Sequence, residues 1–80
     1  MKRYQIIEIE WLDSMAASGW QKAADVIPSP LEEISHKTLG YFFAENERSI
    51  LVVQSRRNDL KYLDGVFEIP KGCIIKIKKL

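Results

Sequence analysis

A short run of donor side chains, Gln54-Ser55-Arg56-Arg57-Asn58, is the strongest candidate for a binding site in this sequence. Arginine guanidinium groups present planar N–H forks that match two phosphate oxygens at once, which lysine cannot do. Two adjacent arginines where a strand ends could therefore clamp a diphosphate or a nucleic-acid backbone. Lys71, on a predicted turn, is expected to face the same end of the fold. The alternative is a solvated loop in which the arginines pair with Asp59 and Asp64.

Three polar residues elsewhere are further candidates for ligand contacts: Asp13, Ser14 and His36. Asp13 and Ser14 favour turns and helix N-caps, where such a residue contributes about 1 kcal/mol. The alternative is a polar pair at the rim of a pocket, bound to a ribose or an amide. His36, the only histidine, fits either a partly exposed strand entry or a donor to a phosphate. Nothing in the sequence places His36 beside Ser14, so no Ser-His-Asp triad is predicted and the protein is not expected to be an enzyme.

Aromatic residues are the third kind of candidate, because a base stacked on one ring gains about 1–3 kcal/mol. Trp20 and Tyr41 are the residues that we expect to stack, and Thr38 is grouped with Tyr41 as a candidate ligand contact. Packing in the core or at an interface is the alternative for Trp11 and Trp20. Tyr62 lies in a polar stretch, where burial explains an aromatic residue less well.

Length and composition predict one small domain, spanning residues 1–80, with 46% hydrophobic residues. Cys73 is the only cysteine, which excludes an internal disulfide and a cysteine-based zinc site and fits a reducing cytoplasm. No metal or cofactor is predicted. No apolar run approaches the roughly 20 residues that span a membrane, so no membrane association is expected. A chain this short has a limited core, which favours a homo-oligomer.

The charge is close to neutral overall but unevenly distributed. The net charge of +1 argues against a dedicated duplex-DNA binder. Residues 1–36 carry three basic and six acidic groups, whereas residues 37–80 carry nine basic and five acidic groups. We therefore expect any anion-binding surface to come from the second half. Lys76, Lys78 and Lys79 either protect an edge strand from sheet-to-sheet association or form a basic stripe for RNA.

Alternating apolar residues predict a mainly β fold. Strands are expected at residues 4–12, 36–45, 49–55, 66–69 and 73–78. Trp20, Ala23, Ala24 and Ile27 recur at helical spacing and predict a helix of about two turns. Residues 31–34 are expected to form a short helical turn or a loop. The order β-α-β-β-β-β with hairpin connections predicts a small SH3-like or Sm-like barrel whose helix caps an open end.

Five short motifs in a fixed order resemble a family of small phage and prophage proteins. They are Trp11-Leu12-Asp13-Ser14, Gly19-Trp20, Thr38-Leu39-Gly40-Tyr41, Val53-Gln54-Ser55 and Ile69-Pro70-Lys71-Gly72-Cys73-Ile74. Leu39 stands where the pattern of that family usually has valine. The resemblance covers most of the chain and implies a phage origin and a β-barrel. In size and build the chain is also similar to phage anti-defence proteins, which are small oligomers that sequester nucleotide immune signals.

These observations predict a protein that binds a small anionic, nucleotide-like ligand in pockets of a homo-oligomer without catalysis. One alternative is a nucleic-acid-binding or regulatory barrel, whose affinity would fall steeply with salt. Another is an adaptor that blocks a host enzyme with a surface containing Trp11, Phe42 or Tyr62. A small hydrolase of nucleotide signals lacks a recognisable catalytic set.

Overall fold

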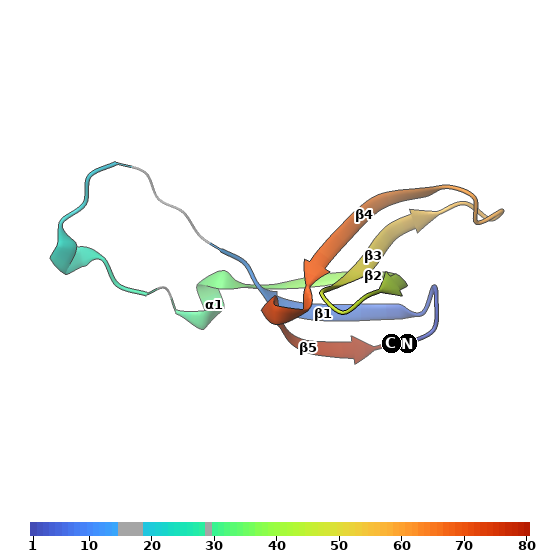
Figure 1. Ribbon diagram of the computed structural model, residues 1–80, viewed down its shortest axis with the longest axis horizontal. Coiled ribbons are helices and arrows are strands. Elements are labelled where there is room, and N and C mark those ends of the chain that lie inside the picture. Colours follow the sequence, from blue (N-terminus) through green and yellow to red (C-terminus); the bar gives the residue numbers. More distant parts are fainter. Residues whose placement is uncertain (15–18, 29) are drawn as a thin grey trace.

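The computed structural model describes residues 1–14, 19–28 and 30–80 and shows five antiparallel strands in one open sheet (Figure 1). The strands are β1 (Ile6–Leu12), β2 (Ser35–Glu45), β3 (Ser49–Arg56), β4 (Leu63–Pro70) and β5 (Ile74–Lys79). Their order across the sheet is β4-β3-β2-β1-β5, so β4 and β5 are its two edges. The predicted mainly β fold is therefore confirmed, with strand ends that lie within three residues of the predicted ones.

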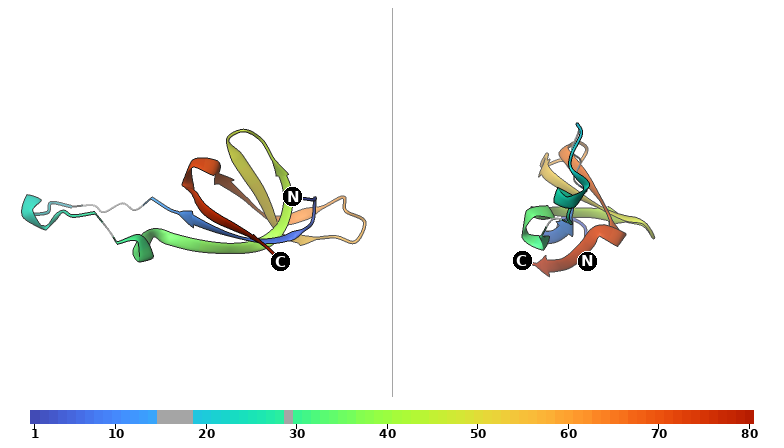
Figure 2. Two further views of the ribbon diagram at one scale, coloured as in Figure 1. Left: turned by 90° about the horizontal axis from the view of Figure 1, so that it is seen from below. Right: turned by 90° about the vertical axis from the view of Figure 1, so that its left-hand side faces the viewer.

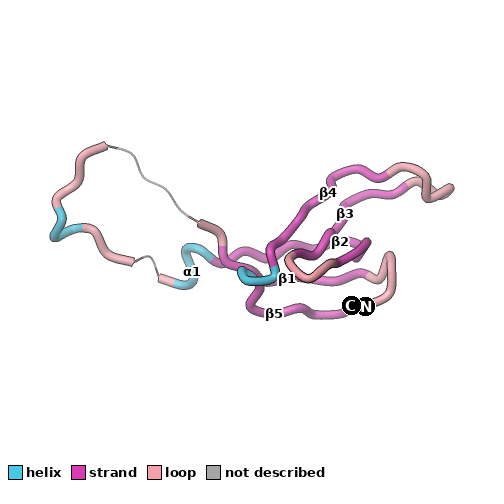
Figure 3. Tube along the Cα trace, viewed as in Figure 1, coloured by secondary structure: helices cyan, strands magenta, loops and turns pink. Residues whose placement is uncertain are grey.

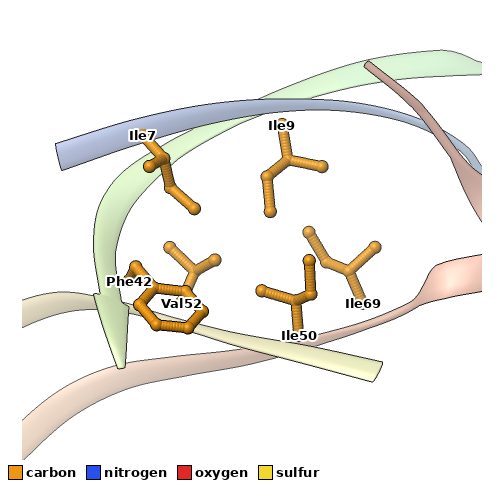
Figure 4. Close-up of a cluster of buried hydrophobic side chains, with 6 residues drawn as sticks. All are labelled: Ile7, Ile9, Phe42, Ile50, Val52 and Ile69. Carbon is orange, nitrogen blue, oxygen red and sulfur yellow. The ribbon is translucent and has the colours of Figure 1, made fainter. Parts of the chain in front are cut away.

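Apolar residues alternate along these strands, and because successive side chains of a strand point to opposite faces, the apolar ones lie together on one face of the sheet. Ile7 and Ile9 of β1 have no exposed surface, whereas Ile6 on the other face is 44% exposed. The core cluster lies between β1 and the β2–β4 part of the sheet (Figure 4). Its members are Ile7, Ile9, Phe42, Ile50, Val52 and Ile69. Phe42 is buried and therefore not available to the alternative adaptor surface, whereas Tyr62 is 61% exposed.

The sheet curls over so that strands that are not neighbours face each other across the core (Figure 2). Register shifts occur between Glu10 and Trp11 and between Phe42 and Ala44. Such bulges bend a strand and increase its twist, which brings the ends of the sheet together. The rings of Trp11 in β1 and Phe67 in β4 consequently lie 5.6 Å apart.

One side-chain hydrogen bond ties β1 to β2 inside this curl. The indole Nε1 of Trp11 donates to Oγ1 of Thr38 at 2.9 Å, and both side chains are partly buried. Thr38→Val keeps the shape of the side chain but removes the acceptor. We expect it to lower the free energy of unfolding by about 1 kcal/mol, because the indole N–H is left without a protein partner.

Thr38→Ser is the matched control for this hydrogen bond, since it retains the hydroxyl group and loses only a methyl group. Thermal unfolding followed by circular dichroism would place its midpoint above that of Thr38→Val. Equal midpoints for the two variants would show that the hydrogen bond contributes nothing to stability.

The segment between β1 and β2 differs most from the sequence prediction. The predicted two-turn helix around Trp20 is wrong: the chain forms only a single 3-10 turn, η1 (Ala23–Asp25), with extended residues on either side. Every residue from 19 to 28 is exposed. A helix of two turns is unstable in water unless packing offsets the cost of nucleation, and residues 19–28 are exposed to solvent instead of being packed.

We call the described residues 19–28 and 30–34 the arm, because they project from one end of the sheet (Figures 1 and 3). The arm ends in the four-residue helix α1 (Leu31–Ile34), which confirms the predicted helical turn and leads directly into β2. The base of the arm is closed where the Asp13 N–H donates to the Ile34 carbonyl at 2.8 Å. The arm extends the molecule to 55 Å along its longest axis instead of capping the core. The radius of gyration, 16.1 Å, exceeds the roughly 12 Å of a compact chain of this length.

Candidate anion-binding site

The end of the β3–β4 hairpin contains a hollow of about 330 Å³, which we call the hairpin hollow. It is lined by Ser55, Arg56, Arg57, Tyr62, Leu63 and Asp64. The antiparallel register places Ser55 opposite Asp64 and Arg56 opposite Leu63. Beyond them the Arg57 N–H donates to the Tyr62 carbonyl at 3.1 Å, which closes the loop. Three of the predicted site residues are thus held by a short hairpin.

Both arginines of the hairpin hollow lie against tyrosine rings. Cζ of Arg57 is 4.7 Å from the ring centroid of Tyr62. Cζ of Arg56 is 5.0 Å from the ring of Tyr4 and 5.2 Å from that of Tyr41. A cation over an aromatic ring gains about 0.5–1 kcal/mol at an exposed site, which restricts a side chain that would otherwise be mobile.

The alternative in which these arginines pair with acidic neighbours is not what the structure contains. Within the described residues, no carboxylate oxygen lies within 4.0 Å of either guanidinium group. Asp59 instead accepts a hydrogen bond from the Lys61 N–H at 2.9 Å. The guanidinium groups of Arg56 and Arg57 also donate no hydrogen bond to any other described residue. Their N–H groups therefore remain available to an oxyanion.

A smaller hollow of about 210 Å³ adjoins the same strand. It is lined by Ile6, Leu39, Gly40, Tyr41 and Gln54. The predicted donor Gln54 is already engaged, because its Nε2 donates to the Leu39 carbonyl at 2.9 Å. Tyr41 lines this hollow and also lies under Arg56, so it stands between the two.

Lys71 does not join the arginines, and the prediction that it faces their end of the fold is wrong. The register pairs Ser49 with Pro70 at one end of β3 and Arg56 with Leu63 at the other. Seven strand residues span about 23 Å, which separates Lys71 from the hairpin hollow. Its Nζ instead lies 3.3 Å from the Glu45 carboxylate, beside the turn between β2 and β3. Lys71 begins the 3-10 turn η2 (Lys71–Cys73) that joins β4 to β5.

The remaining polar candidates gather at the base of the arm. Oδ2 of Asp13 lies 3.7 Å from Nε2 of His36, and the imidazole ring lies 5.3 Å from the Trp11 ring. Thr38 is engaged by Trp11, as described above. Oδ1 of Asp13 accepts the Ser14 N–H at 2.9 Å, which fits the turn interpretation of this pair. This cluster is a second polar site, separate from the arginines, and its assembly was not predicted from the sequence.

The positions of two aromatic residues, Trp20 and Tyr4, differ from what the sequence predicts. Trp20 lies in the arm, is 104% exposed, and belongs neither to the core nor to the hairpin hollow. Tyr4 was not predicted as a site residue, yet it lies under Arg56. Its φ of +69° turns the chain just before β1. No sequence signal indicated this contact, because it depends on how the start of the chain passes the end of β3.

The lysines of β5 do not form an isolated basic stripe. The register places Lys76 opposite Glu10 and Lys78 opposite Glu8 of β1. Together with Lys37 these four residues surround a polar hollow of about 140 Å³. Opposite charges on neighbouring strands attract, so two of the three β5 lysines face carboxylates instead of forming a continuous basic stripe for a nucleic acid.

Comparison with known proteins assigns no function to the hairpin hollow. No protein-family model, curated protein or solved structure matches the chain. Within residues 1–14, 19–28 and 30–80, no three or more His, Cys, Asp and Glu residues are grouped closely enough to hold a metal ion. The helices of that same part of the chain are too short to cross a bilayer. The site must therefore be interpreted from its own geometry.

Proposed function

We propose that this protein binds a small anionic ligand of nucleotide type in the hairpin hollow and does not catalyse a reaction. The observation that carries the proposal is the pair Arg56 and Arg57, whose guanidinium groups are held against tyrosine rings and lack carboxylate partners among the described residues. Two guanidinium groups without carboxylate partners among the described residues, on adjacent residues that line one hollow, would bind two neighbouring phosphate groups.

The other residues of the hollow favour a nucleotide over inorganic phosphate. Tyr62 is 61% exposed, so the face of its ring that Arg57 does not cover would stack with a base. Asp64 adds a carboxylate that repels a bare polyanion but accepts a hydrogen bond from a ribose hydroxyl group. Ser55, opposite Asp64, adds a hydroxyl group to the same wall.

We place the fold among partly open SH3-like barrels. Two features support this: the consecutive strands β1–β4 are neighbours in the sheet, and η2 separates β4 from β5, which returns to pair with β1. In such a barrel the β3–β4 hairpin projects beyond the packed core. A ligand bound at its end would remain accessible from solvent.

The biological setting that we propose is sequestration of a nucleotide signal in the cytoplasm of a bacterial host. It rests on the phage-type sequence motifs and on the expectation that so small a core is completed by further copies of the chain. A binder that is present in excess over its ligand lowers the free ligand concentration without any chemical step.

Thermal stabilisation by ADP and by pyrophosphate would test the binding site directly. A ligand at 100 times its Kd stabilises the folded state by about 2.7 kcal/mol. For a domain of this size we therefore expect the Tm to rise by on the order of 10 °C. Arg56→Ala/Arg57→Ala should lose the response to both ligands, measured against the Tm of the free variant, which the lost contacts with Tyr4, Tyr41 and Tyr62 lower by themselves.

Two further variants make this test specific. Lys37→Ala/Arg48→Ala removes the same charge outside the hollow and should retain the response. Tyr62→Ala should weaken the response to ADP more than the response to pyrophosphate, since only ADP has a base to stack. The proposal is refuted if the wild-type protein responds to neither ligand, or if the double arginine variant responds like the wild type.

A further inference from the structure

The three most exposed large apolar side chains of the described residues all lie in the arm. The exposed fractions are 104% for Trp20, 76% for Ile27, 62% for Val26 and 55% for Leu31. An exposed group of large apolar side chains on a small protein indicates an interaction surface. None of the core-cluster residues lies in the arm, and the described part of the same copy leaves the apolar side chains of the arm exposed, so their partner would come from another molecule.

We propose that the arm docks on the β5 edge of a second copy of this chain, and that the second copy returns the same contact. This inference deepens the homo-oligomer that the proposed function assumes, and it does not require the ligand. The distribution of charge indicates that the partner is a second copy of this chain. The arm carries one basic and three acidic groups, whereas the rest of the chain carries eleven basic and eight acidic groups. An acidic arm and a basic body in the same chain attract each other between copies.

Charge also selects which edge of the sheet receives the arm. The edge strand β4 carries Asp64 and Glu68 and no basic residue, so it repels an acidic segment. The other edge strand, β5, carries Lys76, Lys78 and Lys79. It remains positive even after the two glutamates that β1 places beside it are counted.

The shape of β5 suits an extended segment. Among the described strands it pairs only with β1, so the backbone groups along its other side have no strand partner in that part of the chain. Ile75 and Leu80 expose 45% and 59% of their surface at this edge. Within the arm the backbone is extended at Lys22 and Val26. Extended segments bind sheet edges through their main chain while alternate side chains fill apolar positions.

Reciprocal docking would also bury enough surface for a stable dimer. A stable interface buries about 800 Å² on each partner. A fully exposed tryptophan alone offers up to about 250 Å². In a two-fold dimer each copy contributes both its arm and its β5 edge, so every apolar contact occurs twice.

Sedimentation velocity over a range of concentrations tests this assembly with the full chain. The wild-type protein should be a dimer at high concentration and dissociate on dilution. Trp20→Ser/Ile27→Ser should raise the dimer Kd at least about tenfold, because both anchors of the arm are lost. Leu60→Asn, which removes an apolar side chain of 45% exposure at the tip of the β3–β4 hairpin, is the matched control and should leave the Kd unchanged.

A second pair of variants tests the attraction between the acidic arm and the basic β5 edge. Glu32→Lys, in the arm, should weaken the dimer several-fold, whereas Glu47→Lys makes the same charge change in the turn between β2 and β3 and should not. Raising the salt from about 0.05 to about 0.5 M should weaken the wild-type dimer by screening. A monomer at every concentration, or a dimer that tolerates the loss of both Trp20 and Ile27, would overturn the inference. The Arg56→Ala/Arg57→Ala variant should still dimerise, so failure here is distinguishable from failure of the ligand site.

Discussion

Replacing Ile9 with alanine is expected to remove more than half of the stability of this protein. Ile9 has no exposed surface and lies on the central part of β1, paired with Thr38 on one side and Ile77 on the other. Truncating a fully buried isoleucine to alanine costs about 2–5 kcal/mol, because the cavity does not close. A domain of this size has a total stability of about 5 kcal/mol. Such a loss approaches the limit of folding.

The matched control lies on the same strand. Ile6 has the same side chain but points to the opposite face and is 44% exposed. Ile6→Ala should therefore cost less than about 1 kcal/mol. Urea denaturation followed by far-ultraviolet circular dichroism would compare the two variants. Similar losses for both would mean that the inner face of β1 has been assigned incorrectly.

The second large effect is expected for Gly40→Ala. A Cβ atom built on Gly40 would lie 2.5 Å from Cγ1 of Val52 and 2.8 Å from the carbonyl oxygen of Val53. Val52 and Val53 have no exposed surface, so neither can move into solvent. Overpacking of this kind costs about 1–3 kcal/mol or more, and here it also pushes β2 away from β3. We expect a Tm lower by on the order of 10 °C.

Gly72→Ala provides the comparison for this prediction. Nothing lies within 4 Å of a Cβ at Gly72, which is in η2, and its φ is not in the left-handed region. Reduced freedom of the unfolded chain should stabilise this variant by up to about 1 kcal/mol. Calorimetry on both variants would show the opposite signs. If both lost the same stability, the close approach of β2 to β3 at Gly40 would be contradicted.

The strands could be predicted because their signal is local. Ile7 and Ile9 alternate with Glu8 and Glu10, and that alternation is sufficient to assign β1 and its buried face. Pro70 and Gly72 marked the break between the last two strands, where η2 occurs. Such signals depend only on the backbone properties and spacing of nearby residues.

The predictions of a helix around Trp20 and of Lys71 beside the arginines were wrong, because both depend on contacts between residues that are distant in sequence. Trp20 and Ile27 have helical spacing, but both are exposed and lack the packing that would stabilise a helix. Lys71 was expected beside Arg56, but the register of β3 with β4 places them at opposite ends of the hairpin. Register follows from the whole sheet, so a motif alone does not determine which polar residues meet.

The candidate site was predicted in part. Arg56 and Arg57 were found from residue type and from their place at a strand end, and both lie in the hairpin hollow. Tyr4 was not found, because its contact with Arg56 requires the start of the chain to reach the end of β3. The same holds for the approach of Asp13 to His36 across the base of the arm.

The strand order implies a sequence of events during folding. β2, β3 and β4 are joined by short turns, so they can pair with little loss of loop entropy. β1 joins β2 only across the long connection that contains the arm, and β5 pairs with β1 from the opposite end of the chain. The slow steps of folding therefore fall on β1 and β5, whereas the hairpin that carries both arginines is among the first parts to form. A newly made chain would acquire its guanidinium pair before its core is closed.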